Sequence, residues 1–269
     1  MVYASDLQPR KGSNSIYLRW TLPQSSFDLE YDSDGDLVRS VKSHELYYSV
    51  QCDSECTDLD SVGDQLWNGA LFLGCYLVEN PFLVEGIAVL ELACGVGALG
   101  GLYQALCVQR AVLTDFSRAA LSLCDTNNVD NDKVAVRRLD FKDPDTYFDA
   151  LDEDIGLILA ADVWYDFAIN DAFGDALFAL LSRFSRAEAI LCCEERLNIV
   201  HPAIPPCDVF AQDFFDKFAS GDNARFSITE LQPQTDIVRH LSLAGGPTGS
   251  LLRHCKLYEV SLVLERSSH

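Results

Sequence analysis

The segment Val89–Gly100 reads VLELACGVGALG and constrains the fold more than any other part of the sequence. It overlaps the apolar run Ile87–Leu92, which is typical of a central parallel strand buried on both faces. Gly95, Gly97 and Gly100 follow with the spacing G-x-G-x-x-G, which permits a tight turn and close approach of a ligand to the backbone. A strand, a glycine turn and a helix start near Gly97 predict a nucleotide-type cofactor site, with a ligand-free turn as the alternative.

Strand and helix signals alternate along the chain on both sides of this turn. The expected strands are Ala111–Thr114, Val134–Leu139, Ile155–Ala161 and Ala189–Cys193, and the expected helices are Leu66–Val78, Ala98–Cys107, Ser117–Asn127, Ala168–Phe184 and Val209–Ala219. The last two apolar runs, Phe226–Leu231 and Leu257–Leu264, have no helix between them, which favours an antiparallel pair at one sheet edge. This order predicts an α/β fold with a doubly wound sheet.

The first 62 residues differ from the rest of the chain in their pattern of apolar and acidic residues. Ser15–Trp20 and Leu46–Val50 indicate short strands, with acidic segments around them. We therefore expect residues 1–62 to form a strand-rich extension and residues 63–269 to form the main domain. The extension could position a substrate or only cover a sheet edge.

The formal net charge of −21 narrows the range of partners. An acidic surface repels phosphate backbones and anionic lipid, so direct binding to nucleic acid or membranes is disfavoured. The charge suits a basic protein partner or serves solubility alone. No apolar stretch reaches the roughly 18–20 residues that a membrane span needs.

Ten cysteines and five histidines raise the question of a metal site. No CxxC pair recurs and the histidines lie far apart, so we expect no metal. Several cysteines fall inside apolar runs such as Ile190–Cys193, as small buried side chains do in a reducing compartment. The sequence predicts an intracellular protein.

Three acidic residues separate two cofactor classes. A carboxylate at Glu91, four residues before the first glycine, would repel a pyrophosphate but can bind the ammonium of S-adenosylmethionine. Asp115, after the second strand, can accept from ribose hydroxyls of either class. Asp140, after the third strand, is placed to accept from an adenine amino group, or is an ordinary loop acid. Together they favour S-adenosylmethionine over a dinucleotide.

At these motifs the chain resembles the seven-strand class I methyltransferases, and within them the methyltransferase-like 21 group of protein-lysine methyltransferases. The matching motifs are LWNGA at Leu66–Ala70, the strand and turn at Val89–Gly100, Asp115, Asn127 and Asn131, Asp140, and the acid-x-x-Tyr run Asp162–Tyr165. The resemblance covers about residues 62–264. It implies a Rossmann-like doubly wound sheet, S-adenosyl-L-methionine as cofactor, and the cofactor-binding residues Trp67, Glu91, Ala93, Gly95, Gly97, Asp115, Asp140 and Ala161.

The sequence departs from the family pattern at three positions. Ala93 replaces a glycine, Val96 replaces a threonine, and Phe141 replaces a tryptophan. The first two lie near the methionine part of the cofactor in the family pattern and could alter affinity. None of the three removes a group that the chemistry requires.

The resemblance also implies roles at the substrate side. Asp162 and Tyr165 are the expected catalytic residues, with Asp162 orienting a substrate lysine amine and Tyr165 forming an aromatic slot. Trp164 and Glu194 are expected to contact the substrate, although core packing for Trp164 and a solvated charge for Glu194 are equally compatible with the sequence. Trp67 either covers the cofactor or anchors its helix.

Three other functions stay open at this point. A small molecule could be the methyl acceptor, or the chain could be an adapter that keeps the fold without catalysis. The third is a nicotinamide dehydrogenase, and the absence of a Tyr-x-x-x-Lys run after the glycine turn argues against one major branch of these enzymes only. We expect a monomeric lysine methyltransferase in the nucleus or cytoplasm, acting on a partner protein.

Overall fold

The computed structural model describes residues 7, 13–22, 30–31, 37–38, 44–52, 59–148, 151, 154–198, 207–233, 236–243, 252 and 254–263. The helices are α1 (Asn68–Glu79), α2 (Gly100–Ala105), α3 (Arg118–Asn127), α4 (Phe167–Arg183) and α5 (Val209–Phe218), with 3-10 turns η2 (Leu59–Asp64), η3 (Pro81–Leu83), η4 (Pro144–Thr146) and η5 (Ile237–His240). The strands are β1 (Ser15–Leu22), β2 (Glu30–Tyr31), β3 (Leu37–Val38), β4 (His44–Gln51), β5 (Ala88–Leu92), β6 (Arg110–Asp115), β7 (Val134–Arg138), β8 (Leu157–Ala161), β9 (Glu188–Glu194), β10 (Leu197–Asn198), β11 (Cys207–Asp208), β12 (Phe226–Leu231), β13 (Leu241–Leu243) and β14 (Cys255–Leu262).

Seven strands form the main sheet in the order β12-β14-β9-β8-β5-β6-β7. The five strands from β9 to β7 run parallel to their neighbours, whereas β14 pairs antiparallel with both β9 and β12. β5 is the middle one of the five parallel strands, and every one of its residues is buried. The expected doubly wound seven-strand sheet and the antiparallel pair at its edge are confirmed.

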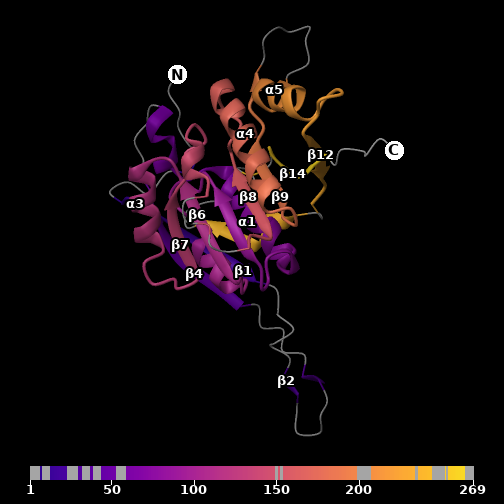
Figure 1. Ribbon diagram of the computed structural model, residues 1–269. Helices are drawn as coiled ribbons and strands as arrows, with labels where there is room; N and C mark the ends of the chain where they lie inside the picture. Colours follow the sequence, from indigo (N-terminus) through magenta and orange to yellow (C-terminus); the bar gives the residue numbers. More distant parts are fainter. Residues whose placement is uncertain are drawn as a thin grey trace.

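Two cores cover the two faces of this sheet, and β5 serves both. Val89 belongs to the core that includes α1, α2 and α3, whereas Leu90 and Leu92 belong to the core of α4 and α5. This alternation follows from the period of two along a strand. Figure 1 shows α4 and α5 close together near the β9, β14 and β12 end of the sheet.

A second sheet of three strands, in the order β13-β1-β4, packs on the α1 side of the main sheet. β1 and β4 confirm the two strands expected in the extension. β13 was not expected there, and it pairs antiparallel with β1 through Leu18↔Leu243. Trp20 of β1 is fully buried, and a Cβ on Gly74 of α1 would lie 2.4 Å from its ring. β1 and β4 of the extension thus share a core with α1, and the domain boundary at residue 62 stays a prediction.

Tyr48 of β4 fastens this small sheet to the glycine turn. Its hydroxyl donates to the carbonyl of Ala98 at 2.8 Å and accepts from the indole Nε1 of Trp20 at 3.0 Å. Tyr48→Phe leaves both buried groups unpaired, so we expect a loss of about 2 kcal/mol in the free energy of unfolding. Urea titration checks this, with Tyr17→Phe, which is 57% exposed, as the control that keeps wild-type stability. Equal stability of the two variants would contradict the assignment.

Candidate functional site

A cavity of about 250 Å³ opens at the carboxyl ends of β5, β6, β7 and β8. β6 and β7 lie on one side of β5 in the sheet, and β8 and β9 lie on its other side. The direction in which successive strands are added to the sheet therefore reverses beside β5. Ligands of open α/β sheets bind at such a reversal. The lining residues are Val62, Gly63, Gln65, Leu66, Trp67, Ala70, Glu91, Ala93, Cys94, Gly95, Val96, Ala98, Asp115, Phe116, Leu139, Asp140, Phe141, Lys142, Ala161, Asp162, Val163, Tyr165 and Ile169.

The turn after β5 has a left-handed backbone at Ala93 (φ 52°), Gly95 (φ 52°) and Gly97 (φ 66°). The helix that follows, α2, begins at Gly100, three residues later than the expected start near Gly97. A Cβ on Gly95 would lie 2.8 Å from the carbonyl oxygen of Gly63. This glycine therefore admits the protein's own η2 segment as well as forming the turn.

Three asparagines at the end of α3 and just after it donate hydrogen bonds to the backbone of this turn and of the start of α2. Asn127 Nδ2 donates to the carbonyl of Val96 at 2.8 Å, and Asn131 Nδ2 donates to that of Gly100 at 2.7 Å. Between them, Asn128 Nδ2 donates to Gly97 at 3.1 Å. These bonds link α3 and the segment after it to the backbone carbonyls of the turn and of the first residue of α2. They give a physical reason for the asparagines that the sequence showed only as a family motif.

Glu91 lies on β5 with its side chain in the cavity wall, 2% exposed. Its Oε2 accepts a hydrogen bond from the hydroxyl of Tyr103 at 2.7 Å. Burial raises the pKa of Glu91 to about 7, and the Tyr103 hydrogen bond opposes that rise. A cationic group bound beside this carboxylate would favour its ionised form and lower its pKa.

Asp115 ends β6 and is only 4% exposed. Its Oδ2 accepts from the backbone N–H of Gly95 at 3.0 Å, and its Oδ1 accepts from that of Ser117 at 2.9 Å. Burial raises its pKa to about 6 against these hydrogen bonds. Each carboxylate oxygen has a second lone pair, so Asp115 can hold the glycine turn and still accept from a ligand hydroxyl.

Asp140 and Phe141 line the cavity from the segment after β7. The carboxylate of Asp140 accepts from Arg138 Nη2 at 2.9 Å and from the backbone N–H of Lys142 at 3.0 Å. The ring of Phe141 meets that of Phe173 edge-on, with 5.2 Å between centroids. The expected adenine-side residues therefore lie where the third strand ends.

Asp162 follows β8 in a left-handed conformation with φ 53°. Its Oδ2 accepts from the N–H of Gly69 at 2.6 Å, and its Oδ1 accepts from the N–H of Glu194 at 2.8 Å. Gly69 lies in the first turn of α1, whose N-cap residue Trp67 makes no side-chain cap, so Asp162 caps this helix from outside. Burial raises the pKa of Asp162, and these bonds and the charge of Arg196 oppose the rise.

Trp67, Ala161 and Tyr165 also line the cavity. The indole Nε1 of Trp67 donates to the carbonyl of Val62 at 2.8 Å, which fixes the ring against η2. Trp67 thus faces the cavity, which favours the expectation that it covers a cofactor. Seven of the eight expected cofactor residues and both expected catalytic residues line one cavity, and the eighth, Gly97, lies in the turn between the lining residues Val96 and Ala98.

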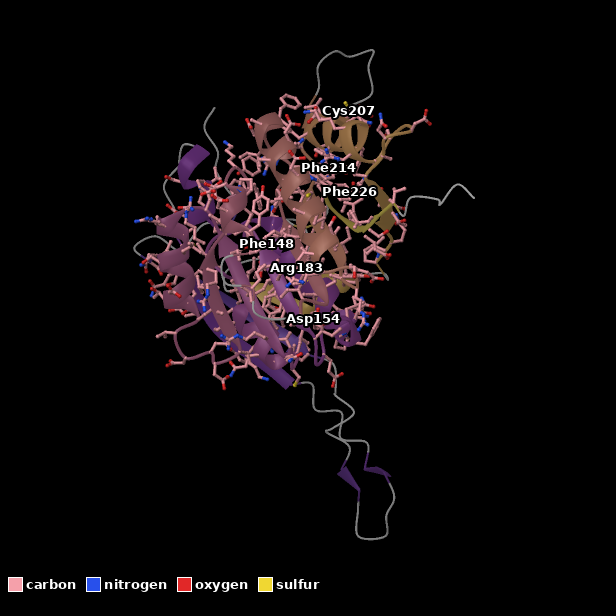
Figure 2. All side chains as sticks on the ribbon, in the orientation of Figure 1. Phe148, Asp154, Arg183, Cys207, Phe214 and Phe226 are labelled. Atoms are coloured by element: carbon pink, nitrogen blue, oxygen red, sulfur yellow. The ribbon has the colours of Figure 1, made fainter. Side chains whose placement is uncertain are left out.

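The two expected substrate residues lie elsewhere. Trp164 is 2% exposed and packs on Phe214, Phe215 and Tyr258, with ring centroids 5.0, 5.2 and 5.2 Å away. The expected substrate contact of Trp164 is therefore replaced by core packing, because its side chain faces α5 instead of the cavity. Phe214, labelled in Figure 2, lies close to Phe226 in the same core.

Glu194 ends β9 and is half-buried beside the start of α1. Its Oε1 accepts from Asn68 Nδ2 at 3.1 Å, and its backbone N–H donates to Asp162. Glu194 is not among the residues that line the cavity. It adjoins the site through Asn68 and Asp162, so a substrate contact of Glu194 stays a prediction.

Sequence reasoning missed the part of the wall that precedes α1. Val62, Gly63, Gln65 and Leu66 close the cavity from the η2 side. A Cβ on Gly63 would lie 3.6 Å from Asp115 Oδ2, so this segment packs directly over the end of β6. The only available signal was the adjacent LWNGA motif, which does not show where the preceding loop lies.

Two further observations concern the described residues alone. Within those ranges, no three His, Cys, Asp or Glu side chains gather as metal ligands. No helix there has the length and apolar character that crossing a membrane requires.

Comparisons with known proteins agree with this geometry. The family described as Lysine methyltransferase matches residues 50–217. Methyltransferase-like protein 22 is 33% identical over 164 residues in Homo sapiens, covering 53% of this chain and 40% of that protein. The Mus musculus protein is 32% identical over 164 residues, covering 53% and 42%. The chain thus spans about two fifths of the length of these curated relatives.

A solved rRNA methylase from Streptococcus thermophilus shares 11% identity, with a TM-score of 0.44 and coverage of 74% of this chain and 99% of that one. Three runs of the sequence predict a similarity to methyltransferase-like protein 22: LWNGAL from Leu66, ADVWYD from Ala161 and EERLN from Glu194. The family match spans more than half of the sequence and contains the glycine turn and the Asp162–Tyr165 run. The chain belongs to the lysine methyltransferase family.

Proposed function

We propose that this protein is an S-adenosylmethionine-dependent methyltransferase that methylates a lysine side chain of a partner protein. The observation that carries the proposal is that two groups of side chains line the same cavity. Glu91, Asp115 and Asp140 line one part of it, and Asp162 and Tyr165 line another. The first group suits the cofactor, and the second suits an amine acceptor.

The residues present fit S-adenosylmethionine. Glu91 can pair with the aminoacyl ammonium, because it is a buried carboxylate whose raised pKa a bound cation would lower. Asp115 can accept from the ribose hydroxyls, and Asp140 from the adenine amino group. A pyrophosphate would meet the negative charge of Glu91, so a dinucleotide fits less well.

When bound, the cofactor supplies a methyl carbon that its sulfonium activates for displacement. The protein must hold a neutral amine in line with that carbon and exclude water. Asp162 is rigidly held by the N–H groups of Gly69 and Glu194, and its remaining lone pairs can orient the amine. Tyr165 supplies an apolar wall for the lysine stem.

Calorimetry with S-adenosylmethionine and with NAD(P) tests the cofactor. We expect saturable binding of S-adenosylmethionine alone; saturable binding of the dinucleotide alone would refute the proposal. Transfer of labelled methyl groups into cell extract then tests the acceptor. Label in lysine of a protein fraction supports the proposal, and label only in small molecules would refute the lysine assignment.

The affinity for S-adenosylmethionine is expected to fall as the pH is lowered from 8 to 6. Only ionised Glu91 attracts the ammonium, and its pKa is about 7 in the free protein. The ionised fraction therefore decreases about tenfold over this interval, and the dissociation constant should rise by up to about tenfold. Calorimetry at fixed ionic strength measures this dependence.

Two variants distinguish the contribution of Glu91 to the pH dependence of the affinity from that of Asp115, whose pKa is about 6. Glu91→Gln should bind weakly at both pH values and lose most of the dependence above pH 7. Tyr103→Phe removes a hydrogen bond that stabilises the ionised carboxylate, so its transition should move to higher pH. A wild-type affinity that is constant from pH 6 to 8 would exclude an ion pair at Glu91.

Three expectations accompany this proposal. The acidic charge of −21 supports a basic partner protein as substrate. We also propose a monomer that acts in the nucleus or the cytoplasm. Fractionation of cells and light scattering of the purified protein measure these two properties.

A further inference from the structure

Arg196 lies beside the cavity in the segment that follows β9. Its guanidinium carbon is 5.5 Å from the centroid of the Trp67 ring and 5.6 Å from that of Tyr165. Both distances are within the range of cation–π attraction. Both rings line the cavity, whereas Arg196 does not. One cation therefore contacts two walls of the site from outside the cavity.

The backbone of Arg196 is fixed independently of these rings. Its N–H donates to Asp208 Oδ2 at 3.0 Å. The other carboxylate oxygen of Asp208 caps α5 by accepting from the N–H groups of Phe210 and Ala211 at 3.0 and 3.1 Å. The guanidinium is thus carried by a segment attached to a helix, which limits where it can move.

The two rings belong to separate parts of the chain. Trp67 precedes α1 and is tied to η2 through its bond to Val62, whereas Tyr165 follows β8 by four residues. Arg196 connects both to the end of β9. Its charge also lies near Asp162, where it opposes the effect of burial on that carboxyl. The contact therefore joins three chain segments around the expected catalytic residue.

We propose that Arg196 is a positioning residue for the reaction: it holds in place Tyr165, the expected wall of the lysine slot, and Trp67, the expected cover of the cofactor. This proposal rests on the proposed function. A planar guanidinium can stack on two rings at once, which an ammonium cannot do equally well. Without it, Tyr165 gains rotamer freedom and the Trp67 ring keeps only its bond to Val62, so ordering the two rings costs free energy when the substrate binds.

An alternative is that Arg196 plugs the site as a substitute for substrate lysine. A plug would lie in the cavity, and Arg196 is absent from its lining. The two interpretations predict opposite effects of removing the guanidinium. Loss of a plug would increase methyl transfer, whereas loss of a positioning residue would decrease it.

The experiment compares Arg196→Gln and Arg196→Lys with Arg225→Gln. Arg225 is a matched control because its guanidinium carbon also lies over two rings, those of Phe178 and Phe218 at 5.2 and 5.7 Å, away from the cavity. Acrylamide quenching of tryptophan fluorescence reports on Trp67, since the other two tryptophans, Trp20 and Trp164, are buried. Calorimetry gives the affinity for S-adenosylmethionine, and label incorporation into extract protein gives the rate of transfer.

We expect Arg196→Gln to raise the quenching constant of Trp67 about twofold and to lower the transfer rate at least tenfold. Its affinity for S-adenosylmethionine should stay within threefold of wild type, Arg196→Lys should recover part of the rate, and Arg225→Gln should match wild type. Unchanged quenching, or a faster rate in Arg196→Gln, would overturn the proposal. Raised quenching together with no transfer even by wild type would support the ring positioning and count against the proposed function.

Discussion

Asp162→Ala is expected to abolish methyl transfer and to lower the free energy of unfolding by about 2–5 kcal/mol. The substitution leaves the N–H groups of Gly69 and Glu194 without their acceptor, and each unpaired buried donor costs about 1–3 kcal/mol. It also removes the cap of α1 and the group expected to orient the amine. Urea titration and label incorporation measure the two effects.

Asp166→Ala is the matched control for this loss. Asp166 caps α4 by accepting from the N–H groups of Ala168 and Ile169 at 2.9 and 3.1 Å, but it does not line the cavity. We expect Asp166→Ala to lower the free energy of unfolding by about 1 kcal/mol and to keep the wild-type rate of methyl transfer. Asp162→Asn keeps the shape of the side chain but only one acceptor oxygen for the two N–H groups, so it should lose about 1–3 kcal/mol of stability, still fold, and lose most activity. Wild-type transfer by a folded Asp162→Asn would contradict the role of this carboxylate.

Gly97→Ala is expected to destabilise the protein by about 3 kcal/mol or more and to weaken cofactor binding at least tenfold. The left-handed backbone at φ 66° costs an alanine about 1–2 kcal/mol. The new Cβ would also lie 2.3 Å from Cys124 Sγ and 2.9 Å from Asn128 Nδ2, so the turn or α3 must move. Thermal unfolding and calorimetry with S-adenosylmethionine measure both losses.

Gly86→Ala separates backbone strain from the clash. Gly86 has a similar φ of 70°, but a Cβ there would meet no heavy atom within 4 Å. Gly86→Ala should lower the free energy of unfolding by about 1–2 kcal/mol and bind the cofactor as wild type does. Adding Cys124→Ala to Gly97→Ala should recover part of the stability by removing the closest contact. Equal losses of stability in Gly97→Ala and Gly86→Ala would show that the contact of the new Cβ with α3 does not contribute to the destabilisation.

The central part of the fold could be predicted because its signals are local. The apolar run of β5 and the glycines after it define a buried strand and a turn without reference to distant residues. Asp115, Asp140 and Asp162 each follow a strand, and the carboxyl ends of neighbouring parallel strands meet at one sheet edge. That is why these separated acids could be assigned to one site.

Contacts between distant segments could not be predicted in the same way. The run Asp162–Tyr165 places Trp164 and Tyr165 side by side in sequence, yet one packs in the core and the other lines the cavity. Neighbouring residues in a turn point in directions that depend on its backbone angles, which the sequence does not show. The contact of Arg196 with Trp67 has the same origin, because it depends on how the ends of β9 and α1 are packed.

The pairing of β1 with β13 bears on how this protein is made. β1 begins at Ser15, and its partner strand ends at Leu243, so the two strands lie far apart in the sequence. During synthesis β1 must wait until the chain has been made as far as Leu243 before this edge of the small sheet is complete. Pairings of such long sequence separation slow folding. A ribosome-bound chain stopped before β13 should therefore leave the β1 edge exposed, where pairing with other chains can begin.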